Sequence, residues 1–256
     1  KNIDSLSPTL VNRTILTQGF LGGTENGRTT TLGREGSDYS AAIFAACLNA
    51  QAVTVWKDVP GILNAYPKLI SEAQLFSEIP YKEAAEMTYY GASVIHPKTI
   101  KPLANKEIPL YVKSFDNPEA KGTTIHNCEF KKPLSSIIIK HNQCLVSFQV
   151  LDYTFINEEN LSLIFKKFAL LDIKINIMQN SAISFSVVID YEESKMSEML
   201  LVLSKDFDVK YNTQLTLITI KNYNKEDIVF HRKNKRILLE QTSRNNYRAL
   251  YSERIH

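Results

Sequence analysis

The chain has 256 residues and a formal net charge of +3, and 44% of its residues are hydrophobic and 22% charged. This length suffices for one or two domains with buried cores, and the composition is that of a globular protein rather than a disordered or fibrous one. The weak positive charge argues against a nucleic-acid partner, and no apolar run reaches the length of a membrane-spanning helix, so we expect neither nucleic acid nor membrane as a partner.

Three cysteines, Cys47, Cys128 and Cys144, follow no recognisable spacing pattern. A small, odd number of unpatterned cysteines favours reduced thiols, so we expect a cytoplasmic protein. The sequence opens without an initiator methionine or a signal peptide, which suggests a piece of a longer polypeptide. A late basic cluster, His231–Arg236, is interpreted as a solvated turn rather than a nucleic-acid patch.

The first half of the chain alternates strand-like and helix-like segments. We predict a strand at Thr14–Phe20, a helix from Ser40 to Leu48 and a strand at Ala52–Lys57. The later segments predicted are helices at Pro80–Tyr90 and Pro97–Lys106, a short extended piece at Ser93–Pro97 and a strand at Pro109–Phe115. This order is typical of a parallel α/β sheet, in which ligands bind beyond the carboxyl ends of the strands.

A glycine-rich loop, Gly27–Tyr39, stands between the first predicted strand and helix. Its glycines allow close approach of the backbone to a ligand, and the free N–H groups of the following helix favour an anion. Arg34 adds a planar group that fits a carboxylate or phosphate, and Asp38 is suited to orient a cationic side chain. The alternative is an ordinary strand-to-helix loop capped by Ser37 or Asp38; the residues alone leave both readings open.

The pattern of predicted elements changes at Lys131–Pro133, and we place a domain boundary after residue 132. Beyond it, short strands alternate with two helices, which indicates a ferredoxin-like α+β module at residues 140–211. Residues 212–256 read as a second, abbreviated copy of that module. The predicted strands are Ile137–Ile139, Cys144–Gln149, Ile173–Met178, Ile183–Ile189, Val209–Tyr211, Leu215–Ile220, Ile237–Gln241 and Tyr247–Tyr251, and the predicted helices Leu161–Leu171 and Met196–Leu203, with room for a short helix within Asn224–Asn234.

Several blocks of the first half resemble the aspartokinases, amino-acid kinases that phosphorylate aspartate. The blocks are FLGGTENGRTTTLGREGSDYSAA, WKDVPGIL, EAAEMTYYGASVIHPKTIKPL, IPLYVKSF and NPEAKGTTI, in this order between residues 14 and 125. The resemblance implies a three-layer αβα kinase domain with a mostly parallel sheet, of which residues 1–132 are the C-terminal part. The module after Lys140 resembles the ACT regulatory domains of that family.

The resemblance also implies a reaction, in which ATP and L-aspartate give ADP and 4-phospho-L-aspartate, with Mg²⁺ held mainly by the phosphates and by no assigned protein ligand. Position by position, Arg34 would grip the aspartate carboxylate, Gly36 and Ser37 would line that site with Phe20, and Asp38 would hold catalytic lysines. The positions that match nucleotide contacts are Lys57, Asp58, Leu63, Lys68, Ser93 and Val94.

The sequence departs from the family pattern at the predicted aspartate site and at the predicted nucleotide site. Glu35, Lys57, Tyr66 and Ser93 replace residues that are usual in the family, and Lys57 could restore the charge missing at Ser93. The KxGGTS phosphate motif is absent from these 256 residues, so we expect the isolated chain to be inactive as a kinase. A non-catalytic regulatory chain carrying the ACT dimer is the alternative.

In the regulatory module, the resemblance implies an amino-acid effector, lysine or threonine, and a homodimer formed through ACT domains. Asn176 and Ala182 stand where lysine-inhibited members carry acidic residues. Gln179 and Asn180 resemble a pair found in threonine-responsive relatives. We therefore predict an altered effector site contacted by Asn176, Gln179 and Asn180. His96 is interpreted as a structural residue, since no cysteine or carboxylate cluster surrounds it in the sequence.

Overall fold

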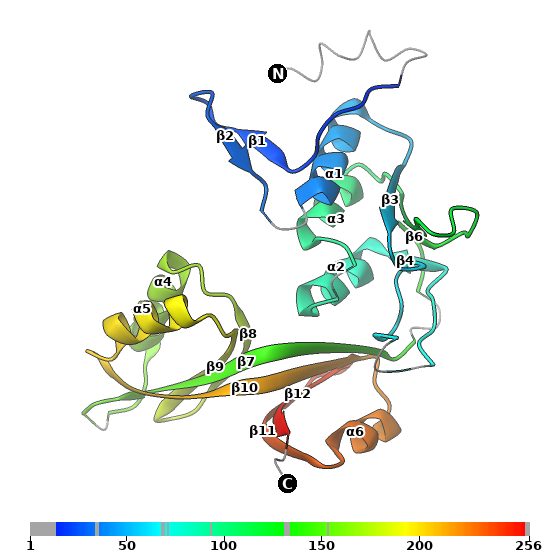
Figure 1. The fold of residues 1–256 in the computed structure, drawn as a ribbon. Coiled ribbons are helices and arrows are strands. Elements are labelled where there is room, and N and C mark those ends of the chain that lie inside the picture. Colours follow the sequence, from blue (N-terminus) through cyan, green and yellow to red (C-terminus); the bar gives the residue numbers. More distant parts are fainter. Residues whose placement is uncertain are drawn as a thin grey trace. The chain divides into compact units, whose positions relative to one another are not determined.

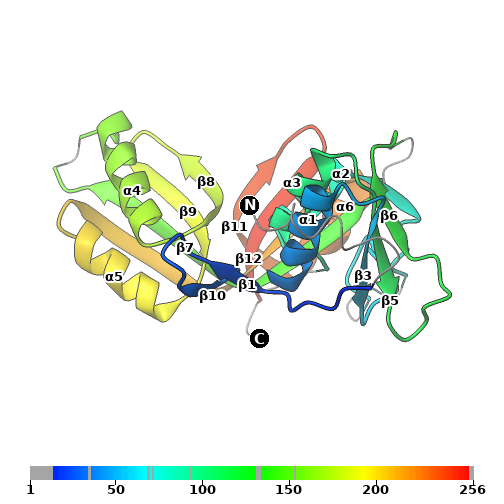
Figure 2. The ribbon, with the colours of Figure 1, turned by 90° about the horizontal axis from the view of Figure 1, so that it is seen from above.

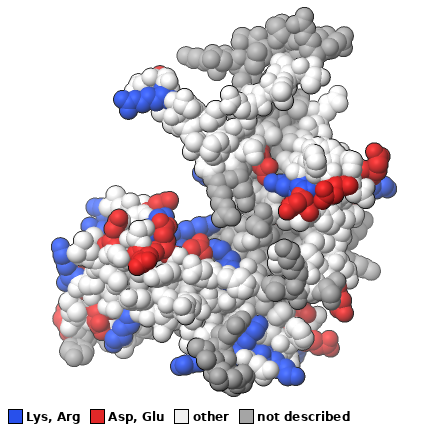
Figure 3. All heavy atoms as spheres, viewed as in Figure 1, with Lys and Arg blue, Asp and Glu red and all other residues white. Residues whose placement is uncertain are grey.

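The computed structural model describes residues 14–33, 36–67, 70, 72–92, 94–130, 134–152 and 154–253. The chain divides into two compact units, the first ending at Ile138 and the second beginning at Ile139 (Figure 1). Among the described residues, no helix combines the length and apolar character that crossing a membrane requires. Basic and acidic side chains are interspersed on the face drawn in Figure 3.

Among its described residues, the first unit contains a hairpin, a four-stranded sheet and three helices. Its elements are β1 (Leu21–Gly23), β2 (Thr29–Thr31), α1 (Gly36–Leu48), β3 (Val53–Lys57), β4 (Glu78–Pro80), α2 (Tyr81–Tyr90), α3 (Pro97–Ala104), β5 (Leu110–Ser114) and β6 (Thr123–His126). β1 and β2 pair antiparallel. The larger sheet has the order β3-β5-β6-β4, with β3–β5 and β4–β6 parallel and β5–β6 antiparallel. This is the mixed, mostly parallel sheet expected from the sequence.

One face of this sheet carries the core of the unit. In β3, Val53 and Val55 are buried whereas Trp56 is 46% exposed, and β5 and β6 alternate in the same way. Figure 2 shows α1, α2 and α3 together on one side of β3, β5 and β6. The buried cluster joins residues of these helices to the inward residues of the strands, among them Ala42, Met87, Leu103, Val55, Leu110 and Ile125. Side chains on the other face of the sheet are therefore left more accessible.

Two local predictions in this unit were wrong. Thr14–Phe20 forms no strand, and the hairpin begins only at Leu21. Phe20 has a φ of 71°, and its N–H donates to Ser40 Oγ at 2.8 Å, so the chain is tied to α1 where a strand was expected to continue. Described residues 94–96 are likewise not a strand. His96 caps α3 instead, its Nδ1 accepting from the Lys98 N–H at 3.1 Å, in agreement with the structural role predicted for it.

The second unit is built on one six-stranded sheet. Its elements are β7 (Ser136–Val150), α4 (Glu158–Leu170), β8 (Ile175–Asn180), β9 (Ser184–Asp190), α5 (Glu193–Leu203), β10 (Phe207–Lys221), α6 (Lys225–Arg232), β11 (Lys235–Thr242) and β12 (Asn246–Glu253). The strand order is β11-β12-β10-β7-β9-β8. The succession β7-α4-β8-β9-α5-β10 is the βαββαβ order of a ferredoxin-like module, as expected. Helices α4 and α5 pack on one face around Phe148, Phe168 and Phe185.

β7 and β10 are each one long strand where the sequence predicted two. The predicted gaps hold polar residues, among them the exposed Asn142 and Gln214, which adopt positive φ values of 54° and 57° inside the strands. β10 runs without a break through residues 211 and 212, so the expected division between these residues falls inside a strand. The segment from residue 212 onward thus extends the same sheet.

The six-stranded sheet is curled. Arg248 of β12 donates to the carbonyl oxygen of Asn176 in β8 at 2.7 Å, although these strands are not neighbours in the sheet.

Candidate active site

The first turn of α1 is shaped by a glycine. Gly36 is buried at the start of the helix, and a Cβ added there would lie 2.9 Å from Leu32 Cβ and 3.4 Å from Phe20 Cδ2. A side chain at this position would therefore push the hairpin away from the helix. Ser37 is exposed, and the N-terminus of the helix attracts negative charge, although the Gly36 N–H already donates to the Gly33 carbonyl oxygen at 3.2 Å. Arg34 and Glu35, which precede the helix, lie outside the described residues.

Asp38 and Lys57 form an ion pair. Lys57 Nζ lies 2.7 Å from Asp38 Oδ2, which joins the first turn of α1 to the carboxyl end of β3. The Asp38 side chain is largely buried, at 10% exposure, whereas the Lys57 side chain keeps 22%. The sequence pointed to Asp38 as a residue that orients a cation and to Lys57 as a nucleotide contact, but not to the pair. Its effect is to fix an ammonium group beside a helix N-terminus.

Phe20 borders the same helix turn. Its ring is 43% exposed and lies beside Gly36, and Leu32 N–H donates to the Phe20 carbonyl oxygen at 2.7 Å, closing the base of the hairpin. Sequence reasoning overlooked Ser40, whose Oγ donates to Gly36 O at 3.0 Å and accepts from the Phe20 N–H. A serine in the first turns of a helix commonly bonds backbone groups nearby, so this residue type was the available signal.

The residues predicted to contact a nucleotide are only partly described. Asp58 directly follows Lys57 and is exposed. Leu63 forms an isolated antiparallel backbone bridge with Leu75, and the Val94 side chain packs against the core. Lys68 and Ser93 lie outside the described residues. Lys57 is in register with Ser114, and because β3 and β5 are parallel their carboxyl ends meet at one edge of the sheet, as expected for a ligand site.

Asn176, a predicted effector contact, is instead built into a buried network. It is the extra residue of a β-bulge in β8, because Ile175 pairs with Ile189 and Ile177 with Val188. The bulge turns its side chain inward, to 8% exposure. Its Nδ2 donates to Gln143 Oε1 at 2.8 Å and to Asp190 Oδ1 at 3.1 Å, and its Oδ1 accepts from Lys140 Nζ at 3.1 Å. Most of its hydrogen-bonding capacity is therefore used inside the protein.

The carboxylate in this network belongs to Asp190, and hydrogen bonds from neighbouring side chains stabilise its charged form. Burial by itself would raise the pKa of Asp190, but hydrogen bonds from Gln143 and Lys140 and the positive charge of Lys140 lower it below its ordinary value. Lys140 Nζ approaches Asp190 to 2.8 Å. Burial and the nearby charge of Lys140 also lower the pKa of Lys174. The network holds β7, β8 and β9 together through side chains.

Gln179 and Asn180, the other two predicted effector contacts, are exposed at the end of β8. The turn that follows is ordered by Ser181, whose Oγ accepts from the Ser184 N–H at 3.1 Å. Ala182 contributes its carbonyl oxygen, which accepts from the Ile156 N–H at 3.0 Å, so this turn meets the segment before α4. The exposed amides and the buried Asn176 thus do not form one cluster among the described residues.

Residues 3–114 match the amino acid kinase family. Over 186 residues the chain is 38% identical to the lysine-sensitive aspartokinase 3 of Escherichia coli (strain K12), an alignment that covers 72% of this chain and 41% of that protein. It is 41% identical over 139 residues to a bifunctional aspartokinase/homoserine dehydrogenase of Buchnera aphidicola, covering 54% of this chain and 17% of that one.

The fold agrees with a solved aspartokinase. E. coli aspartokinase III, crystallised with aspartate and ADP, superimposes with a TM-score of 0.84 at 30% identity, covering 98% of this chain and 62% of that one. The same enzyme with lysine and aspartate gives a TM-score of 0.74 over 96% of this chain and 58% of that one. The chain is therefore a homologue of the aspartokinases, and the resemblance predicted from its sequence is confirmed. The sequence alignment spans about two fifths of the E. coli relative, and the superposition spans 62% of it.

Proposed function

We propose that this chain contributes the substrate loop and the regulatory modules of an aspartate kinase. The reaction transfers the γ-phosphoryl group of ATP to the side-chain carboxylate of L-aspartate, giving ADP and 4-phospho-L-aspartate, the entry to lysine, threonine and methionine synthesis. The observation that carries the proposal is the Asp38–Lys57 pair at the N-terminus of α1, within the segment that matches the amino acid kinase family.

The chemistry of the α1 turn suits an amino-acid dicarboxylate. An aspartate carboxylate is already ionised at neutral pH and attacks without a base, so catalysis rests on positioning and on neutralising phosphoryl charge. In this proposal, Arg34 and the N-terminal turn of α1 at Gly36 and Ser37 bind the carboxylates of the substrate, and Phe20 covers the site. Asp38 keeps the Lys57 ammonium pointed at the region where phosphate charge develops.

The nucleotide lies, in this proposal, beyond the carboxyl ends of β3 and β5. Lys57 provides a cation for the phosphates of the nucleotide. The other residues that line the nucleotide site are Asp58, Leu63, Lys68, Ser93 and Val94. The half-buried ammonium of Lys57 fits a polyphosphate ligand, because it is held in place and still reaches solvent. Mg²⁺, bound mainly through the phosphates, would neutralise part of their charge.

We assign residues 1–132 to the C-terminal part of the kinase domain, residues 140–211 to an ACT domain and residues 212–256 to a shorter ACT-like segment. The ACT domains pair into a homodimer and bind an amino-acid effector, lysine or threonine, in a cytoplasmic enzyme. Support for lysine comes from the E. coli relative, which is named lysine-sensitive and was solved with lysine. Gln179 and Asn180 are the exposed contacts in this proposal, with Asn176 supporting the strand beneath them.

The test is an assay of the protein expressed from its complete coding sequence. We expect aspartate-dependent ADP formation, lowered by lysine or by threonine when each is added separately. The Asp38→Asn variant should lose most of this activity while retaining its fold. The isolated 256-residue chain should show little ADP formation, because it contains no KxGGTS motif. A folded complete protein without aspartate-dependent activity would favour the non-catalytic regulatory chain.

A further inference from the structure

Three side chains capable of binding a metal ion meet on the first unit, outside the proposed kinase site. They are Glu78, His126 and Cys128, and their ligand atoms all lie within 4.8 Å of one another. We propose that these three residues form a binding site for a divalent metal ion of the zinc class.

Strand register explains why the three side chains meet. β4 and β6 are parallel, with Glu78 opposite Thr124 and Pro80 opposite His126. Ile79 and Ile125 point into the core, so Glu78, Thr124 and His126 lie on the opposite face of the sheet. Cys128 follows His126 by two positions, which keeps it on the same face just beyond the strand end. The buried side chains of Ile79 and Ile125 fix the two strands that carry Glu78 and His126.

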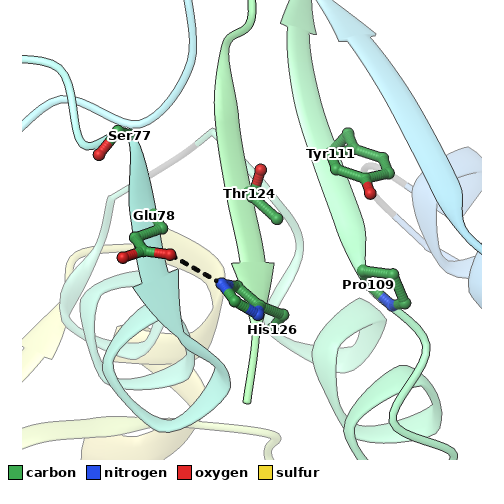
Figure 4. Close-up of a pocket in the computed structure, with 6 residues that line it drawn as sticks. All are labelled: Ser77, Glu78, Pro109, Tyr111, Thr124 and His126. Atoms are coloured by element: carbon green, nitrogen blue, oxygen red, sulfur yellow. Dashed lines mark hydrogen bonds and ion pairs between the residues drawn. The ribbon is translucent and has the colours of Figure 1, made fainter. Parts of the chain in front are cut away.

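The separation of the atoms is close to that of a coordination sphere. His126 Nε2 lies 3.1 Å from Glu78 Oε2, as shown by the dashed line in Figure 4. Ligands at about 2.0–2.3 Å from a tetrahedral zinc ion are about 3.5 Å apart, so this pair already has a suitable spacing. Cys128 lies beyond the end of β6, where rotation of its short side chain can bring the sulfur to the same ion.

The set of donor atoms selects the metal. Thiolate, imidazole and carboxylate together suit Zn²⁺, whereas Mg²⁺ and Ca²⁺ prefer oxygen ligands alone. The ordinary alternative is a surface ion pair between Glu78 and His126, both partly exposed and contributing little to stability. Cys128 distinguishes the two readings, because an ion pair does not need it.

A three-ligand site leaves a coordination position for water or a small ligand. Glu78 and His126 line a pocket of about 440 Å³, together with Ser77, Pro109, Tyr111 and Thr124. In Figure 4, Glu78 and His126 point toward each other at one side of this pocket, with Thr124 between them and Tyr111. The open position of the metal would be reached from this pocket.

The cluster is separate from the Asp38–Lys57 pair. Lys57 is in register with Ser114 at the end of β5, whereas Ile125, next to His126, is in register with Leu110 at its beginning. Four residues of strand separate these positions, which corresponds to about 13 Å. The metal site would thus lie at the opposite end of the sheet, and its presence does not depend on the proposed kinase function.

The test uses the 256-residue chain and metal ions alone. Zn²⁺ affinity is measured by competition with a chromophoric chelator, and Co²⁺ is added to look for the sulfur-to-metal charge-transfer absorption of a thiolate ligand. The variants are Cys128→Ser, His126→Gln and Glu78→Gln. Matched controls are Cys47→Ser, which removes the exposed thiol of α1, and Glu25→Gln, which removes an exposed carboxylate of the β1–β2 turn.

We expect one Zn²⁺ per chain, a Co²⁺ charge-transfer band that disappears in Cys128→Ser, and a loss of affinity of about tenfold or more in each ligand variant. The two controls should bind as the parent chain does. Binding that is absent, or that is unchanged by Cys128→Ser, would overturn the proposal. Circular dichroism of each variant shows whether a loss of binding reflects a loss of fold.

Discussion

The Lys57 ammonium lies 2.7 Å from the Asp38 carboxylate, although the two residues are 19 positions apart in the chain. The contact joins the end of β3 to the first turn of α1 and orients the only basic side chain of that strand. Because Asp38 is largely buried, it depends on Lys57 for charge compensation. The same contact restricts Lys57, which is the property that a phosphate-binding lysine needs.

Replacing Lys57 by methionine should lower the free energy of unfolding of the first unit by about 1–3 kcal/mol, because the Asp38 carboxylate loses its charged partner. The remaining exposure of Lys57 keeps this cost below that of a fully buried pair. Urea unfolding followed by the fluorescence of Trp56, the single tryptophan, measures it. The exposed Lys121→Met serves as control, with an expected change within about 0.5 kcal/mol. Equal stability of Lys57→Met and the parent chain would contradict the pairing.

Substituting Gly36 by alanine should weaken aspartate binding. A Cβ there would meet Leu32 at 2.9 Å and Phe20 at 3.4 Å, so the hairpin would shift away from the α1 turn. In the complete protein we expect the KM for aspartate to rise by about tenfold, with a smaller change in kcat. Gly23→Ala is the matched control, since a Cβ at that position comes no nearer than 3.9 Å to another atom. The prediction fails if both alanine variants have the same KM.

The second unit should lose stability in acid through Asp190. Its pKa is lowered in the folded state, so its stabilisation is fully present above the unfolded value of about 3.9 and is lost as the pH falls through the lower, folded value. Hydrogen exchange of β7 and β9 should therefore accelerate as the pH falls below about 4. In Asp190→Asn this acceleration should be smaller. Because the Asp190 side chain is half exposed, we expect an effect below about 1 kcal/mol.

A control for this titration is available in the same unit. Asp172 is fully exposed and has a φ of 50°, a backbone conformation that asparagine accepts readily. Asp172→Asn should therefore leave the acid profile of β7 and β9 unchanged. A profile altered equally by both substitutions would assign the effect to net charge rather than to the Asp190 network.

Asn176 and Gln179 should respond differently to alanine. Asn176→Ala removes hydrogen bonds to Gln143, Asp190 and Lys140, so we expect a destabilisation of about 1–3 kcal/mol in thermal unfolding. Gln179→Ala, at an exposed position, should leave stability within about 0.5 kcal/mol and weaken effector binding by about tenfold. Calorimetry with lysine and with threonine separately measures the binding. Unchanged affinity in Gln179→Ala would remove this residue from the effector site.

Much of the secondary structure followed from local patterning. The positions of α1, α2, α4 and α5 were predicted to within a few residues, because apolar periodicity and capping residues are properties of short segments. The strand predicted at Thr14–Phe20 failed, because strand formation needs a partner and the neighbouring group is Ser40 of α1. The interruptions predicted in β7 and β10 failed because both strands continue through residues with positive φ.

The sequence by itself determined the family, the α1 turn with Gly36, Ser37 and Asp38, and the order of strands and helices in the second unit. Only the tertiary structure decided which side chains meet. The Asp38–Lys57 pair, the burial of Asn176 in a β-bulge and the meeting of Glu78 with His126 all depend on contacts between segments distant in the chain. Strand register and helix packing set these contacts, and a change of register by one residue would send the same side chains to the other face of the sheet.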